Sequence, residues 1–219
     1  MIPAPLAIFL VAAAFWESWR WLAQRTWWNP EDAVILAVTG GLVLALAARR
    51  VLAGRGLGTL PALPLVAAVL AHIALVRLAP PLAAASLAVT ATLAAVWIAT
   101  HDERPPPAFW GLCLLIMPVL PTLQFFLGYP MRLVSAALTV PLLRLNGIAV
   151  TRSGVTLEWR GETILFDAPC SGVTMLWAGL LLLFVVTTIQ RASWTELSRA
   201  TFLALRLLLA ANVLRAASL

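Results

Sequence analysis

The stretch CSGVTMLWAGLLLLFVVTTIQ, residues 170–190, decides the class of this protein. It contains no charged residue, and its length matches the ~20 apolar residues that a helix needs to cross a bilayer. Further apolar stretches of similar length cover residues 2–18, 33–50, 60–77, 81–100, 108–129 and 200–219. We therefore expect an all-α polytopic membrane protein with about seven transmembrane helices.

The composition supports a membrane protein and argues against a nucleic-acid-binding one. Of the 219 residues, 62% are hydrophobic and only 11% are charged, which is more apolar surface than a soluble domain of this size needs. The net charge is +6, and every basic residue is an arginine. Because no basic cluster is interleaved with exposed aromatic residues, we expect the lipid bilayer as a partner and no nucleic acid.

The chain has two cysteines, Cys113 and Cys170. Two cysteines make neither a disulfide framework nor a zinc site, so we expect no metal and no cofactor. Cys113 lies inside a fully apolar run, which favours a small buried hydrophobic residue. Cys170 is different, because it lies where a polar segment becomes an apolar stretch. It is the residue from which a function can be argued.

Residues 130–169 form an insertion between the fifth and sixth predicted helices. Its first part, 131–146, is apolar and predicts an interfacial or re-entrant helix. Its second part alternates apolar and polar residues between turn signals, which predicts a small β-meander over 148–166. A meander with unpaired edges cannot face lipid, so it must lie at or outside the membrane surface. We expect one integral membrane domain over 1–219 that contains this insertion.

The last two predicted helices bring two polar residues to one side of the membrane. Consecutive membrane helices are antiparallel, so Cys170 at the start of the sixth and Arg215 near the end of the seventh share one face. With a cytoplasmic N-terminus, the short connections after the second and sixth helices carry arginines inside, as the positive-inside rule requires. The insertion and the face that carries Cys170 are then extracytoplasmic.

Cys170 has the setting of an activated thiol. We expect it in the first turn of its helix, where the macrodipole and free N–H groups stabilise a thiolate. Arg215 supplies a permanent cation. Asn212, three residues earlier on nearly the same helix face, can orient that cation by hydrogen bonding. The free N–H groups can also form an oxyanion hole, and Gly172 lets a substrate backbone approach closely.

Structural interpretations compete with these functional ones. A lone cysteine near a helix start is usually structural, and Ser171 is an alternative nucleophile without an evident base. Cysteine-dependent acyl transfer normally uses a histidine. We interpret His72, in mid-membrane, as a packed polar residue and His101, in a connection on the opposite face, as a solvated one. Arg206 lies mid-helix, out of phase with Arg215, and we expect it to pair with a carbonyl or an acid.

Two motifs carry a resemblance to a known family. One is APCSG, residues 168–172, at the head of a membrane helix, and the other is ANVLR, residues 211–215, in the following helix. With the segment 154–166 just upstream, they resemble the exosortase/archaeosortase family of membrane-embedded cysteine transpeptidases. The Cys-Ser-Gly element alone is weak, but its combination with Asn-x-x-Arg is fairly specific. The N-terminal half is similar only in hydropathy.

The resemblance implies a substrate class and roles for the site residues. Members of that family are thought to act on membrane-anchored proteins with a C-terminal sorting signal, made of a short motif, a transmembrane helix and a basic cluster. Cys170 would attack the scissile carbonyl and form a thioacyl-enzyme, which an acceptor then resolves. Arg215 would stabilise the oxyanion, with Asn212, Ser171 and Gly172 binding or orienting the substrate. The implied location is the prokaryotic cytoplasmic (inner) membrane, multi-pass, with the active site on the extracytoplasmic face.

The family's third residue is a histidine in a further helix after the arginine. The sequence ends at Leu219, so we expect a chain truncated before that histidine rather than a natural variant that lacks the general acid/base. Two other classes of function stand beside the enzyme: a transporter or channel subunit, and a non-catalytic membrane assembly or scaffold protein. The transporter is disfavoured because few polar residues line the predicted helices at mid-depth.

Overall fold

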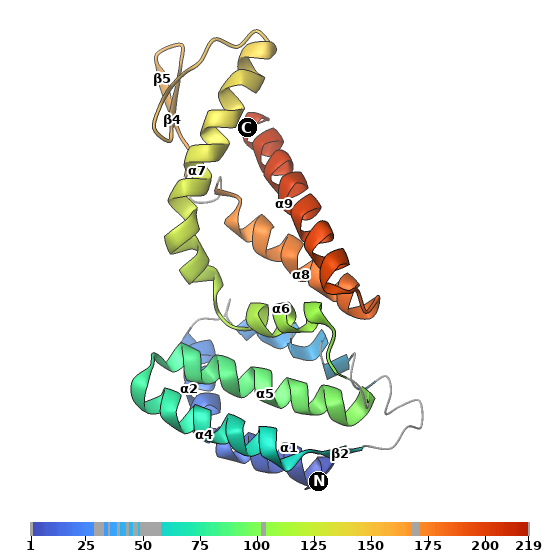
Figure 1. Cartoon of the computed structure of the whole chain (residues 1–219). Helices are drawn as coiled ribbons and strands as arrows, with labels where there is room; N and C mark the ends of the chain where they lie inside the picture. Colours follow the sequence, from blue (N-terminus) through green and yellow to red (C-terminus); the bar gives the residue numbers. More distant parts are fainter. Residues whose placement is uncertain are drawn as a thin grey trace. The chain divides into compact units, whose positions relative to one another are not determined.

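The computed structural model describes residues 2–28, 33–34, 36–38, 40–42, 44–45, 48, 58–101, 104–167 and 171–218. The chain divides into two compact units, Met1–Pro118 and Val119–Leu219 (Figure 1). Both consist mainly of apolar helices, as expected for a membrane protein.

The first unit is built around one central helix, α5. Its elements are β1 (Ile2–Pro3), α1 (Ala4–Ala14), α2 (Trp16–Trp28), β2 (Thr59–Leu60), α4 (Ala62–Leu78), α5 (Pro81–His101) and α6 (Pro107–Ile116). Helix α5 packs against α1, α2, α4 and α6. Ala84, Ala85 and Ala88 of α5 are buried. Their small side chains permit the neighbouring helices to pack closely.

Helices α1 and α2 replace the single helix predicted over 2–18. They meet at an angle of 66°, with Phe15 between them. Phe15 is fully buried and packs with Val11 and Ala88 in the core of the unit. The prediction of one helix ending near residue 18 is therefore wrong, because a core side chain fixes a bend inside the apolar stretch.

Both histidines lie in the first unit and have close neighbours. His72 Nε2 and Ser18 Oγ share a buried hydrogen bond of 2.7 Å, and the ring of Phe15 lies 4.6 Å from the imidazole between centroids. His72 is thus a packed polar residue, as predicted. His101 is buried and stacks on Trp97 at 3.9 Å. The prediction of a solvated loop residue is wrong, because α5 extends through His101.

Three helices and a small sheet make up the second unit. The elements are α7 (Leu120–Leu145), β3 (Thr151–Ser153), β4 (Thr156–Trp159), β5 (Glu162–Leu165), α8 (Val173–Ile189) and α9 (Trp194–Ala217). The three helices pack pairwise, as Figure 1 shows. A capping box begins α9: the Ser193 hydroxyl accepts the N–H of Glu196, and the Glu196 carboxylate accepts the N–H of Ser193.

Helix α7 corrects two predicted boundaries. The helix predicted over 108–129 is interrupted between α6 and α7. Pro118 disfavours helical backbone at the residue before it, and Met117 is extended with a ψ of 152°. Helix α7 then continues without a break through two internal prolines. The apolar part of the predicted insertion, 131–146, is therefore the second half of α7 and not a separate interfacial helix.

The predicted β-meander is present as a three-stranded antiparallel sheet in the order β3-β4-β5. Leu157 and Phe166 are buried in a cluster with Ala136 of α7. At the end of that helix, Arg144 donates from Nε (3.1 Å) and Nη2 (2.8 Å) to the carbonyl oxygen of Val150. The sheet is thus attached along the second half of α7. Its place outside the membrane stays a prediction.

Several described helices are suited to a bilayer. Helices α5, α7 and α9 are long and apolar enough to cross one, and the bent pair α1–α2 raises the number of candidate spans to four. Helices α4, α6 and α8 are apolar but shorter. The stretch predicted over 33–50 lies partly outside the described residues. A multi-pass membrane protein is supported, whereas the predicted number of seven helices is not confirmed.

Candidate functional site

The start of α8 differs from the prediction. Cys170, the predicted nucleophile, lies outside the described residues. Helix α8 begins at Val173, and Gly172 is its N-cap with left-handed backbone (φ 75°, ψ 4°). A left-handed residue cannot belong to a right-handed helix. Helix α8 thus begins three residues later than predicted, and the expected position of Cys170 in a first helical turn lies outside the described residues.

Asn212 forms the centre of a polar contact between α7 and α9. Its side chain is only 1% exposed, and its Nδ2 donates to Ser135 Oγ of α7 at 2.8 Å. Its Oδ1 accepts from Nη2 of Arg215, one turn further along α9, at 3.4 Å. This geometry allows Asn212 to orient Arg215, as expected from the spacing of the two residues in the sequence.

Gly172 lies directly against this amide. A Cβ atom at Gly172 would lie 2.6 Å from Cγ of Asn212, closer than real Cβ contacts come. Together with the positive φ, this contact makes glycine the residue that the position requires. The N-terminal end of α8 therefore packs onto Asn212. On that side of Gly172, the Asn212 amide occupies the space through which a substrate backbone was expected to approach.

Ser171 is buried, and its hydroxyl oxygen accepts the N–H of Val173 at 3.3 Å. This bond satisfies one of the N–H groups that the beginning of a helix leaves without an intrahelical partner. Among the described residues, no histidine or carboxylate is hydrogen-bonded to Ser171. The contact favours a structural role for this serine over the alternative nucleophile.

Arg132 and Ser135 of α7 were not singled out in the sequence. Arg132 donates from Nη1 to the carbonyl oxygen of Phe166 at 3.5 Å and from Nε to that of Gly128 at 3.3 Å. It therefore ties α7 to the end of the sheet, four residues before Cys170. The available signal was that both are polar residues among apolar neighbours in α7.

The family comparison agrees with the motifs around this cluster. The family model described as Transmembrane exosortase (Exosortase_EpsH) matches residues 3–219. This chain belongs to the transmembrane exosortase family. The match includes the N-terminal half, which the motifs did not reach. No curated protein and no solved structure matches the chain.

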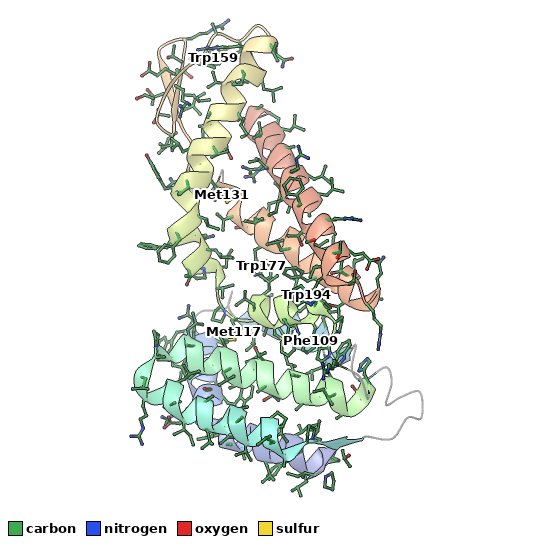
Figure 2. The ribbon with its side chains drawn as sticks, viewed as in Figure 1. Phe109, Met117, Met131, Trp159, Trp177 and Trp194 are labelled. Atoms are coloured by element: carbon green, nitrogen blue, oxygen red, sulfur yellow. The ribbon has the colours of Figure 1, made fainter. Side chains whose placement is uncertain are left out.

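An apolar cavity adjoins Gly172 in this exosortase. It has a volume of about 280 Å³ and lies between α7, α8 and α9. The lining residues are all apolar; Met131 is labelled on α7 in Figure 2, and the full set is Pro130, Met131, Val134, Gly172, Leu176, Leu205, Leu208 and Leu209. The cavity therefore suits an aliphatic or aromatic group and not a charged one.

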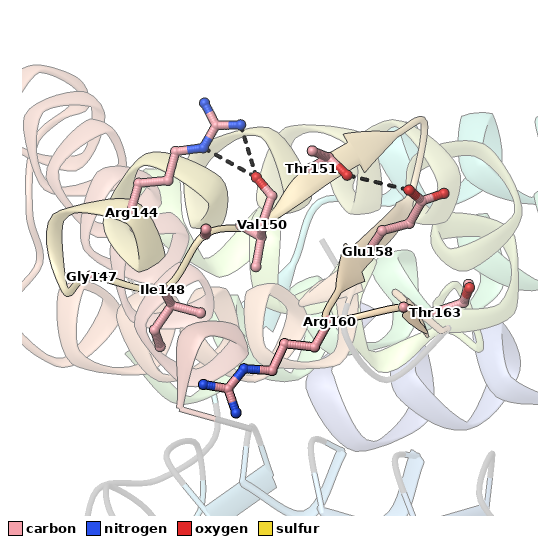
Figure 3. A pocket seen from close by; sticks show the side chains of 10 residues that line it. Arg144, Gly147, Ile148, Val150, Thr151, Glu158, Arg160 and Thr163 are labelled. Carbon is pink, nitrogen blue, oxygen red and sulfur yellow. Dashed lines mark hydrogen bonds between the residues drawn. The ribbon is translucent and has the colours of Figure 1, made fainter.

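A larger and more polar hollow lies at the sheet of the exosortase, away from Asn212. It has a volume of about 780 Å³ between the end of α7 and the strands. Figure 3 shows Arg144 turned onto Val150 and Thr151 bonded to Glu158, the latter at 3.3 Å. These groups are engaged with one another, and none of the predicted site residues lines this hollow.

Arg206 has a contact of a different kind from the hydrogen bonds around Asn212. Arg206 lies with its Cζ 5.1 Å above the ring of Phe202, on the same helix. The partner expected for it was a carbonyl or an acid; within the described part of the chain the contact is an aromatic face. No group of three or more His, Cys, Asp or Glu side chains suited to a metal occurs among the described residues.

Proposed function

We propose that this exosortase-family chain is a cysteine peptidase and transpeptidase. It cleaves the C-terminal sorting tails from membrane-anchored proteins through a thioacyl-enzyme and transfers the remaining protein to an acceptor. The observation that carries the proposal is the contact of Asn212 with both Arg215 and Gly172. It joins the two motifs, which lie far apart in the sequence.

Chain connectivity relates Cys170 to this contact. Gly172 is two positions after Cys170, and two extended residues span at most about 7 Å between Cα atoms. Gly172 in turn packs on the amide that bonds Arg215. A thiol and a guanidinium that are connected in this way can act on the same peptide bond.

The proposed reaction has two steps. In the first, the Cys170 thiolate forms a bond to the scissile carbonyl carbon, and Arg215 stabilises the negative charge on the oxygen. The C–N bond then breaks, and the tail leaves as an amine that takes up one proton. In the second step, an acceptor nucleophile loses its proton, attacks the thioester carbonyl and releases the thiolate. The acyl group ends on the acceptor.

The apolar cavity beside Gly172 supports a membrane-borne substrate. Its lining offers no hydrogen-bonding side chain, and it lies between helices that expose apolar residues. An apolar segment that follows the scissile bond fits this chemistry and enters laterally between helices. The same lining gives no support to a transporter of polar solutes, which would need polar groups at mid-depth. The inner membrane and its extracytoplasmic face are the proposed setting.

The proposal is tested by co-expressing the protein with a membrane-anchored substrate that bears a cognate tail. Processing is followed by the loss of the tail on an immunoblot. Cys170→Ala should abolish processing, whereas Cys113→Ala should retain it, because Cys113 is buried in α6 of the other unit. Undiminished processing by Cys170→Ala, at equal abundance in the membrane, would contradict the enzymatic proposal. It would favour a non-catalytic scaffold protein.

A further inference from the structure

The hydroxyl of Ser135 occupies an enclosed position on α7. The residue is 0% exposed, and its Oγ accepts a hydrogen bond from Nδ2 of Asn212 at 2.8 Å. The two residues are 77 positions apart in the sequence. A buried amide that lacks a partner is costly, so this bond favours one orientation of the Asn212 side chain.

The orientation of the amide decides what Arg215 meets. An asparagine amide carries a donor on one side and an acceptor on the other. With Nδ2 directed to Ser135, Oδ1 is directed to Nη2 of Arg215 at 3.4 Å. If the amide turned over, it would present N–H groups to a guanidinium, which has no acceptor.

Gly172 closes the third side of the amide. The space of its absent Cβ atom is within 2.9 Å of all three terminal atoms of Asn212, namely Cγ, Oδ1 and Nδ2. The side chain is therefore held between α7 and the N-terminal end of α8. A small displacement of the Asn212 amide would therefore also displace the residues that follow Cys170.

We propose that Ser135 is a positioning residue of the site: through Asn212 it fixes the guanidinium of Arg215. Its effect on turnover rests on the proposed function, whereas its effect on Arg215 does not. Ser135 does not touch the reacting atoms. It acts by holding the acceptor that receives the Arg215 N–H.

The chain offers a matched control one helical turn away. Thr139 lies four residues after Ser135 on α7 and is also 0% exposed. Its hydroxyl has no hydrogen-bond partner among the described residues. Thr139→Val removes this hydroxyl and keeps the shape of the side chain, so it reports what the loss of any buried hydroxyl on this helix face does.

The first experiment measures Arg215 itself and needs no substrate. The purified protein is treated with phenylglyoxal, which modifies guanidinium groups, and the modification of the Arg215 peptide is followed by mass spectrometry. Ser135→Ala should raise the rate at Arg215 about five- to tenfold, the size expected for one lost hydrogen bond. Asn212→Ala should raise it as much, and Thr139→Val should leave it unchanged. An unchanged rate in Ser135→Ala overturns the proposal.

The second experiment measures turnover in the processing assay. Ser135→Ala should lower kcat about five- to tenfold with little change in KM, because the interaction acts on a group used in the transition state. In an Asn212→Ala background, the same substitution should have no further effect. Additive losses overturn the proposal. If Cys170→Ala remains active, the proposed function fails, and the phenylglyoxal result still decides the role of Ser135.

Discussion

The side chain of Asn212 fills the space in which a Cβ atom of Gly172 would lie. Asn212 belongs to α9 and Gly172 is the N-cap of α8, so the contact fixes where the chain enters α8 after the sheet. It also explains why the two motifs occur together: the glycine of one leaves room for the asparagine of the other.

Gly172→Ala should therefore destabilise the second unit and stop processing. The new methyl group meets Asn212, and an alanine with positive φ is strained, so we expect a loss of about 2–5 kcal/mol from overpacking and backbone strain together. Thermal unfolding in detergent measures it. Gly161→Ala is the control, because Gly161 also has a positive φ (84°) but nothing within 4 Å of its Cβ position. Equal losses in both variants would contradict the packing argument.

Arg215→Lys should leave the protein folded but nearly inactive. Lysine keeps the positive charge and loses the planar fork through which Nη2 reaches Asn212. Loss of a positioned oxyanion donor lowers kcat by about 10²- to 10³-fold. Arg206→Lys in the same helix serves as the control and should retain activity. Wild-type turnover of Arg215→Lys would remove this arginine from the site.

Gly179→Ala should narrow the apolar cavity. A Cβ at Gly179 would lie 2.6 Å from the Leu208 side chain, which lines the cavity. Leu208 is flexible and can turn into the cavity, so we expect at most about 1–3 kcal/mol of destabilisation. The effect should appear in the processing assay as a higher KM for the tailed substrate. Gly128→Ala, where a Cβ meets nothing within 4 Å, should leave KM unchanged.

Arg144→Lys should loosen the sheet without disturbing the helices. Two N–H groups of Arg144 converge on the carbonyl oxygen of Val150, and a lysine cannot reproduce that fork. Hydrogen exchange of the β3 and β4 amides should accelerate about tenfold, as expected for the loss of about 1.4 kcal/mol. Arg152→Lys, whose bond to the carbonyl of Gly154 is exposed, should change exchange much less.

Hydropathy predicted the helices better than their ends. The apolar stretches become α4, α5, α8 and α9 with small shifts of boundary, because apolar length is the main requirement of a bilayer. The prediction was wrong near α7 because prolines act differently there. Pro118 interrupts the predicted helix, whereas Pro130 and Pro141 lie inside a continuous one. Neighbouring groups decide whether a proline is tolerated, and a single sequence does not show them.

The candidate site was predictable only where its residues are close in sequence. Asn212 and Arg215 share one helix, so their spacing predicted the contact. Ser135 was missed because its partner is 77 residues away, and a lone serine in an apolar helix carries no local signal of what it bonds. Gly172 was singled out for the approach of a substrate backbone, but the sequence did not show that Asn212 occupies the space of its missing side chain.

The length of α7 has a consequence for how a substrate is chosen. With 26 residues the helix is about 39 Å long, more than the ~30 Å hydrocarbon core of a bilayer. On the prediction that the sheet lies outside the membrane, α7 leaves the hydrocarbon near Ala136, on which the sheet packs. Ser135, and with it Asn212, then lies at the height where lipid gives way to water.

A site at that height makes cleavage depend on how far a peptide bond lies from the bilayer. On the proposed function, the scissile bond is the one whose distance from the substrate's own membrane helix brings it level with Asn212. Recognition then depends on spacing as well as on side chains. Residues inserted between the cleaved bond and the substrate helix should move the cut or prevent it, even where the motif itself is intact.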